Sequence, residues 1–173
     1  MKHIPNILTL IRMALIPFIP YFYIIHDNRL FSILIIGIAA LSDILDGYLA
    51  RHFQLVTELG KVLDPLADKL LLIAIVLSLF YTKNFPMILL VAFLVIEIGM
   101  IILGSILYTR PDRIVIAANR YGKIATVFFM LTAILSIWYG YTQAVSILFM
   151  ITLLLKGYAF SKYLQIYLHQ SKT

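Results

Sequence analysis

Six stretches of about 20 largely apolar residues dominate the sequence, and a helix of this length is enough to cross a lipid bilayer. Hydrophobic residues make up 62% of the 173 residues and charged residues only 13%, which is too little polar surface for a water-soluble domain. Because lipid cannot hydrogen-bond to exposed backbone amides, we expect helices, and the runs are too long and uniform for β-barrel strands. The predicted spans are Ile7–Ile25, Leu30–Ala50, Gly60–Tyr81, Phe85–Tyr108, Tyr121–Tyr139 and Ala144–Leu164.

The sequence therefore predicts an all-α, polytopic membrane protein with one domain over residues 1–173. Its lack of cysteine excludes disulfides and thiolate chemistry. One set of predicted helix ends carries most of the basic residues, whereas the opposite set carries only Arg29 and Lys83. The positive-inside rule then places both termini, and the second and fourth connections, in the cytoplasm. The basic set comprises Lys2, Arg12, Arg51, Lys61, Arg110, Arg113, Arg120, Lys123, Lys162 and Lys172.

Five acidic residues lie within the predicted spans: Asp43, Asp46, Asp64, Asp68 and Glu97. An unpaired charge inside a bilayer costs about 2.5–3.5 kcal/mol on insertion scales, so these acids require compensation. The first two aspartates are three residues apart and the next two are four apart, so each pair projects from one face of its helix. The second and third helices form a hairpin that brings the two pairs to a similar depth. We therefore expect four carboxylates to converge in a polar cavity that opens to the cytoplasm.

Converging carboxylates repel one another unless a cation is bound between them. Ligands that are all oxygen select hard cations, which favours Mg²⁺ or Mn²⁺ over zinc. Four aspartates suit two divalent ions, and paired ions are typical of phosphoryl-transfer sites. Small residues on the same helix faces, Gly47, Ala50 and Gly60, leave room for a phosphate ligand, and Arg51 is suited to a diphosphate. Helix packing explains the small residues equally well.

Residues 43–68 read D-x-x-D-G-x-x-A-R, eight residues, then G-x-x-x-D-x-x-x-D. This pattern resembles the full signature of the CDP-alcohol phosphotransferase (phosphatidyltransferase) family, whose members have six transmembrane helices with this motif on the second and third. Residues 5–12 (PNILTLIR), 63–69 (LDPLADK) and 122–126 (GKIAT) are similar to the bacterial phosphatidylglycerophosphate synthases and the related cardiolipin synthases. The resemblance covers most of the chain.

The resemblance implies a role for each matching residue. Asp43, Asp46, Asp64 and Asp68 would bind two divalent cations, Mg²⁺ or Mn²⁺, and Asp68 would also act as the general base. The implied donor is CDP-diacylglycerol, with CMP as the leaving group. Contacts to this CDP-lipid would come from Gly47, Ala50, Arg51, Thr57 and Gly60.

The alcohol acceptor is predicted less directly. Glycerol 3-phosphate is the first choice and phosphatidylglycerol, giving cardiolipin, is the alternative. Phosphatidylglycerophosphate synthases have an Arg-Glu pair and a further Arg in the fourth helix, where this sequence has Ile96, Glu97 and Gly104. Glu97 is expected either to orient the acceptor or to pair with a basic residue of a neighbouring helix. The remaining predicted acceptor contacts, which alternatively serve only to set the membrane topology, are Arg110, Arg113, Arg120 and Lys123.

The partners and setting follow from the same resemblance. We expect membrane lipids and the two substrates as partners, a homodimer as in other members of the family, and no nucleic acid. The expected location is a bacterial-type cytoplasmic membrane, with the active site facing the cytoplasm. Two other functions are a cation transporter, because intramembrane carboxylates often mark ion pathways, and a catalytically altered family member that only binds lipid. The clustering of the acids toward one face of the membrane argues against the transporter.

Overall fold

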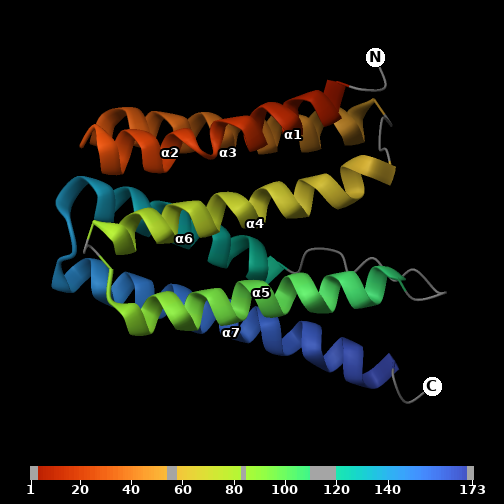
Figure 1. Cartoon of the computed structure of the whole chain (residues 1–173). Coiled ribbons are helices and arrows are strands. Elements are labelled where there is room, and N and C mark those ends of the chain that lie inside the picture. Colours follow the sequence, from red (N-terminus) through yellow and green to blue (C-terminus); the bar gives the residue numbers. More distant parts are fainter. Residues whose placement is uncertain (1–3, 54–57, 83–84, 110–119, 171–173) are drawn as a thin grey trace. The chain divides into compact units, whose positions relative to one another are not determined.

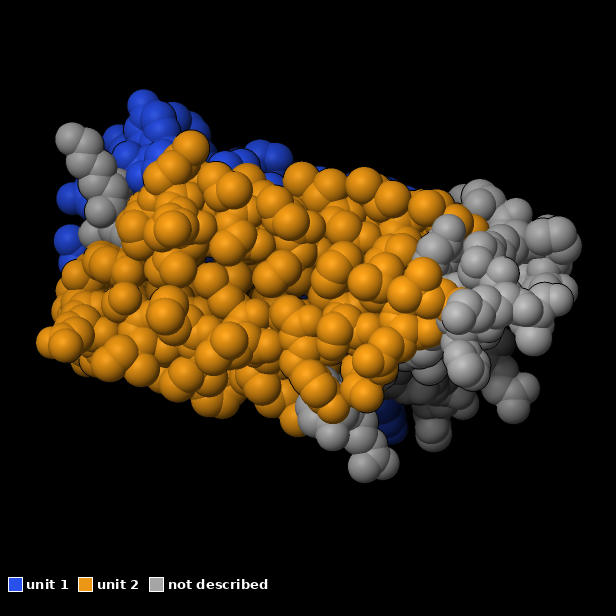
Figure 2. Space-filling model, turned by 90° about the horizontal axis from the view of Figure 1, so that it is seen from below, with its two compact units in different colours: residues 1–83 blue, residues 84–173 orange. Residues whose placement is uncertain are grey.

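The computed structural model describes residues 4–53, 58–82, 85–109 and 120–170, and all regular structure within these ranges is helical (Figure 1). The chain divides into two compact units, Met1–Lys83 and Asn84–Thr173, which are coloured separately in Figure 2. Each of the six predicted spans is present as a helical segment, so the prediction of an all-α polytopic protein is confirmed. The single domain and the polar cavity stay predictions.

The first unit is built around its N-terminal helix, which packs against both of the long helices that follow. Pro17 and Pro20 interrupt the first predicted span, because proline has no amide hydrogen for the helical ladder. A short α-helical turn and a π-helical turn result, and the span still reaches Ile25. The elements are α1 (Ile4–Leu15), α2 (Phe18–Pro20), η1 (Tyr21–Ile25), α3 (Arg29–His52) and α4 (Glu58–Tyr81).

The start of α3 is fixed by a side-chain cap. The Oδ1 of Asn28 accepts a hydrogen bond from the backbone N–H of Phe31 at 3.1 Å, which satisfies an amide that the helix cannot pair internally. Asp27, just before it, has a φ of 46°, a left-handed conformation that aspartate tolerates better than most residues. The tight turn between η1 and α3 thereby brings α3 back alongside α1 (Figure 1).

The second unit consists of α5 (Met87–Thr109), α6 (Arg120–Tyr139) and α7 (Gln143–Gln170), with α7 packed against both of the others. Its interior is aromatic: the rings of Phe93 and Phe129 stack with centroids 4.6 Å apart. Gly99 allows α5 and α7 to approach closely, since a Cβ at this position would lie 2.9 Å from Cε2 of Phe160. Gly140 ends α6 with a φ of 77°, the left-handed conformation common just after a helix.

The burial pattern of the described residues is that of a membrane protein, because large apolar side chains face outward while polar ones lie inside. Five helical segments are long and apolar enough to cross a membrane. Helix α4 is more polar than these, since every 18-residue stretch of it contains Asp64, Asp68 and Lys69. The buried polar side chains include Thr9, Arg12, Ser32, Ser42, Asp46, Ser78, Glu97, Thr132, Ser136, Thr152 and Lys156.

Candidate active site

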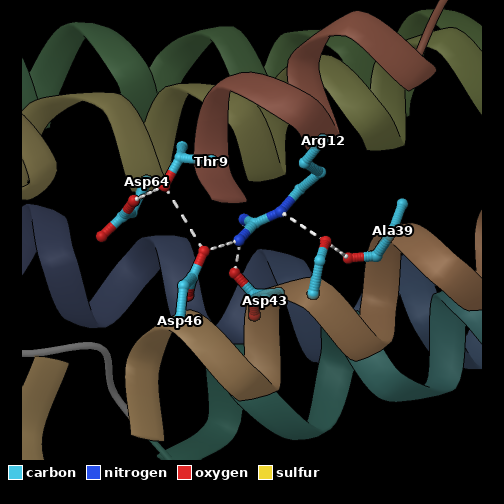
Figure 3. A network of polar contacts seen from close by, with 7 residues as sticks. Thr9, Arg12, Ala39, Asp43, Asp46 and Asp64 are labelled. Atoms are coloured by element: carbon cyan, nitrogen blue, oxygen red, sulfur yellow. Dashed lines mark hydrogen bonds and ion pairs between the residues drawn. The ribbon is translucent and has the colours of Figure 1, made fainter. Parts of the chain in front are cut away.

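A network of polar side chains lies where α1 packs against α3 and α4 (Figure 3). Arg12 of α1 is its centre and is completely buried. Its Nη1 donates to Oδ1 of Asp43 at 2.6 Å, and its Nη2 forms a short ion pair with Oδ2 of Asp46. Asp43 and Asp46 are three residues apart on α3, so one turn of helix presents both carboxylates to one guanidinium.

Thr9, one turn before Arg12, extends the network to α4. Its hydroxyl lies 2.6 Å from Oδ1 of Asp64 and 3.4 Å from Oδ2 of Asp46. A threonine hydroxyl carries one proton, so the shorter contact to Asp64 is the stronger hydrogen bond. Three of the four predicted aspartates are thus connected through two side chains of α1.

The two carboxylates bound by Arg12 differ sharply in exposure. The Asp43 side chain is 52% exposed, whereas the side chains of Asp46 and Arg12 are 3% and 1% exposed. The network therefore has a closed side at Asp46 and an open side at Asp43. Of the two carboxylates, only that of Asp43 is substantially exposed.

The chemistry of the donors fits a hard divalent cation, because the aspartates supply only oxygen. Within the described residues, no three acidic, histidine or cysteine side chains are grouped so that they could hold a metal ion. Asp68 lies one turn after Asp64 on α4 and is half-buried, and Figure 3 does not draw it. The assignment of the four aspartates as metal ligands stays a prediction.

The residues predicted to contact the CDP-lipid lie at the ends of α3 and α4 that are joined by residues 53–57. Gly47 follows Asp46 on α3 and is half-buried, and Gly60 is buried in the first turn of α4. Ala50 and Arg51 are in the last turn of α3, but their side chains lie outside the described part of the chain. Thr57 lies wholly outside the described residues.

Glu97, one of the predicted acceptor contacts, lies in the interior of the second unit. It is completely buried on α5 and forms an ion pair with Lys156 of α7. Lys156 Nζ also lies 5.2 Å from the ring centroid of Phe93 and 5.7 Å from that of Phe129. The structure thus bears out the expectation that Glu97 pairs with a basic residue of a neighbouring helix.

The other predicted acceptor contacts are only partly described. Lys123 is exposed in the first turn of α6, and Arg120 begins that helix, with its side chain outside the described residues. Arg110 and Arg113 lie outside the described residues. On α5, Ile96 is half-buried and Gly104 is exposed, and neither is basic, whereas the family resemblance predicts arginine at both positions.

Three polar residues of these networks were not predicted as site residues. Arg12 is counted in the sequence among the basic residues of helix ends, but the structure places it inside the first unit. Thr9 and Lys156 are single polar residues in apolar runs. Charge balance could have identified the two basic residues. Buried acids in α3 and α5 require cations from other helices, and only a few basic residues lie within the spans.

Comparison with known proteins identifies the family. The model of the CDP-alcohol phosphatidyltransferases matches residues 2–158. The chain is 36% identical over 132 residues, 75% of its length, to the CDP-diacylglycerol–glycerol-3-phosphate 3-phosphatidyltransferase of Aquifex aeolicus, and this match spans 72% of that protein.

Two further relatives are matched over shorter stretches. The protein of the same name from Rickettsia typhi is 40% identical over 49% of this chain and 48% of its own length. The human cardiolipin synthase (CMP-forming) is 33% identical over 62% of this chain and 35% of its own length. The chain is therefore an integral membrane protein that belongs to the CDP-alcohol phosphatidyltransferase family.

Proposed function

We propose that the chain transfers a phosphatidyl group from CDP-diacylglycerol to an alcohol, with release of CMP. The observation that carries this proposal is the family signature over residues 43–68, of which Asp43, Asp46 and Asp64 share one network of contacts to α1. The family match and the names of the relatives support the same reaction. They also favour an enzyme over a cation transporter.

Each of the predicted site residues has a role in this reaction. Asp43, Asp46, Asp64 and Asp68 would hold two divalent cations. Mg²⁺ or Mn²⁺, when bound, offsets the negative charge of the donor diphosphate. Asp68 removes the proton from the acceptor hydroxyl, whose oxygen attacks the β-phosphorus of the donor. A new P–O bond forms to the acceptor, the bond between the two phosphates breaks, and CMP leaves.

The donor nucleotide is bound by residues around the connection between α3 and α4. Gly47 and Gly60 give the diphosphate close access to the helix backbones, and Arg51 pairs with its charge. Ala50 and Thr57 complete this part of the site. The half-exposed Asp43 side chain is proposed to lie on the side from which the donor enters.

Glycerol 3-phosphate is the proposed acceptor, which would give phosphatidylglycerophosphate. The stretches 5–12, 63–69 and 122–126 and the Aquifex and Rickettsia relatives support this choice. Phosphatidylglycerol is the alternative, supported by the human cardiolipin synthase match and by Ile96 and Gly104. Arg110, Arg113, Arg120 and Lys123 are proposed to bind the acceptor phosphate.

The orientation follows from charge. The excess of Lys and Arg at one set of helix ends favours cytoplasmic termini and an active site at the cytoplasmic face of a bacterial-type membrane. A homodimer is proposed from the resemblance to the family.

Release of CMP tests this function. Purified protein in lipid nanodiscs is given CDP-diacylglycerol and Mg²⁺ or Mn²⁺, with glycerol 3-phosphate, phosphatidylglycerol, inositol phosphate or serine in separate reactions. CMP release with glycerol 3-phosphate, absent in Asp68→Asn, is the expected result. Release only with phosphatidylglycerol would make the chain a cardiolipin synthase, and no release with any acceptor would contradict the proposal. Metal flux into proteoliposomes would support the transporter instead.

A further inference from the structure

The three aspartates of Figure 3 are contacted by two side chains that belong to a different helix, α1. Arg12 donates to Asp43 and Asp46, and Thr9 lies within hydrogen-bonding distance of Asp46 and Asp64. These contacts join α1 to both helices that carry the acidic signature. They lie at the carboxylates themselves, not elsewhere on the helix faces.

We propose that Thr9 and Arg12 are positioning residues, which hold the carboxylates of Asp43, Asp46 and Asp64 close to one another where the proposed divalent cations would bind. This inference rests on the proposed function, because it assumes that these aspartates bind metal. It adds two residues outside the family signature over residues 43–68. They act on the metal through the aspartates and not as ligands.

The way in which the carboxylate oxygens are used agrees with a positioning role for Thr9 and Arg12. The contacts with α1 involve Oδ1 of Asp43, Oδ2 of Asp46 and Oδ1 of Asp64. Each carboxylate thus uses one oxygen for α1, and its second oxygen takes no part in these contacts. Carboxylate ligands of metals are commonly held in this way, with a hydrogen bond from the protein on one oxygen and the metal on the other.

The orientation of the Arg12 side chain is itself fixed. Its Nε donates to Oγ of Ser42 at 3.4 Å, and Ser42 donates its own proton to the carbonyl oxygen of Ala39 at 2.8 Å. The serine oxygen is therefore left to accept from Arg12. With Nε held on Ser42, the planar guanidinium directs its two other nitrogens at Asp43 and Asp46.

Thr9 contacts Asp64 of α4, whereas both carboxylates paired with Arg12 belong to α3. Asp64 is on α4, and its 2.6 Å contact with the Thr9 hydroxyl orients this carboxylate toward the pair on α3. Thr9 is completely buried, so water does not replace its hydroxyl easily. The loss of this hydroxyl should release the Asp64 carboxylate while leaving the apolar contacts of α1 in place.

A matched pair of substitutions separates positioning from packing. Thr9→Val has nearly the same shape without the hydroxyl, and Thr9→Ser keeps the hydroxyl with a smaller side chain. Mn²⁺ binding is measured on the full-length protein in nanodiscs without substrate, from the electron paramagnetic resonance signal of free Mn²⁺. Loss of such a supporting contact typically weakens metal binding about 10- to 100-fold, which we expect for Thr9→Val, with Thr9→Ser close to wild type.

Arg12 is tested in the same assay. Arg12→Lys retains a charge but not the three donor directions, and Arg12→Met removes both. We expect Arg12→Met to weaken Mn²⁺ binding more than Arg12→Lys does. Because loss of this buried cation also threatens folding, thermal melting of each metal-free variant is recorded, and Thr9→Val provides the readout if Arg12→Met does not fold.

The outcomes are distinguishable. Mn²⁺ binding that is unchanged in Thr9→Val, with only the melting temperature lowered, would show that α1 merely packs, and would overturn the inference. Tighter binding in Arg12→Met would also overturn it, because Arg12 would then compete with the cation. If the wild-type protein itself bound no Mn²⁺, the proposed metal site would fail, and the inference with it.

Discussion

Lys156 of α7 forms a buried ion pair with Glu97 of α5, and this pair joins the two helices across the interior of the second unit. The side chains of both residues are at most 2% exposed. The lysine also lies over the rings of Phe93 and Phe129. Each buried charge is thus compensated by the other, so the two residues should behave as one unit when substituted.

The first prediction concerns the stability of this pair. Lys156→Met and Glu97→Gln should each lower the free energy of unfolding by about 3–5 kcal/mol, because the partner's charge stays buried without compensation. The double variant Glu97→Leu/Lys156→Met should recover most of this loss, since no charge remains. Unfolding in detergent titrated with SDS measures the effect. Lys162→Met on the same helix is the control, because its polar contact is exposed. Equal stability of the wild type, the two single variants at Glu97 and Lys156 and the double variant would contradict the prediction.

The second prediction concerns the general base. Asp68→Asn should lower the rate of CMP release by about 10²- to 10⁴-fold, the usual contribution of a positioned base. The control is Asp27→Asn, an exposed residue with a φ of 46° that asparagine adopts readily. Asp27→Asn should retain wild-type activity. Full activity of Asp68→Asn would remove this residue from the mechanism.

The third prediction concerns the cations. Treatment with EDTA should abolish CMP release, and added Mg²⁺ or Mn²⁺ should restore it, because an all-oxygen donor set prefers hard cations. The helical circular dichroism should not change, since the helices are held by apolar contacts and by the ion pairs of Arg12 and Lys156. Turnover that persists in EDTA would argue for a reaction without metal.

The fourth prediction concerns the acceptor. Lys123→Met should raise the KM for glycerol 3-phosphate about tenfold or more with little change in kcat, because a hydrogen bond to a charged group contributes about 1.5–3 kcal/mol. Steady-state kinetics of CMP release measures both constants. Lys162→Met, which removes a charge from α7, is the matched control. A KM equal to that of wild type would assign Lys123 to membrane topology alone.

Much of the fold follows from simple features of the sequence. The six apolar runs and the polar connections predicted the helices, since backbone amides in lipid must pair within their own segment. The structure extends α7 to Gln170, six residues beyond the predicted end at Leu164, because polar residues continue a helix as readily as apolar ones. The apolar run over residues 7–25 did not predict the π-helical turn that follows Pro17 and Pro20.

The candidate site was less predictable. Helical spacing alone placed Asp43 beside Asp46, because this pairing is local. The partners of these aspartates come from another helix, α1. Packing over the whole unit decides which face of α1 turns toward α3, and the spacing of residues in the sequence does not show this. Arg12 consequently looked like an interfacial residue. In the same way, Glu97 suggested a basic partner without indicating that it would be Lys156, 59 residues further along the chain.

The order of the elements along the chain gives the Arg12 contacts a consequence for biogenesis. Since α1 is synthesised before α3, Arg12 leaves the ribosome before Asp43 and Asp46 do. Helix α3 can therefore enter the bilayer after Arg12, whose positive charge is then available to neutralise much of the charge of Asp43 and Asp46. Moving the arginine to a later helix would leave two carboxylates exposed to lipid during insertion, even if the finished protein had the same contacts.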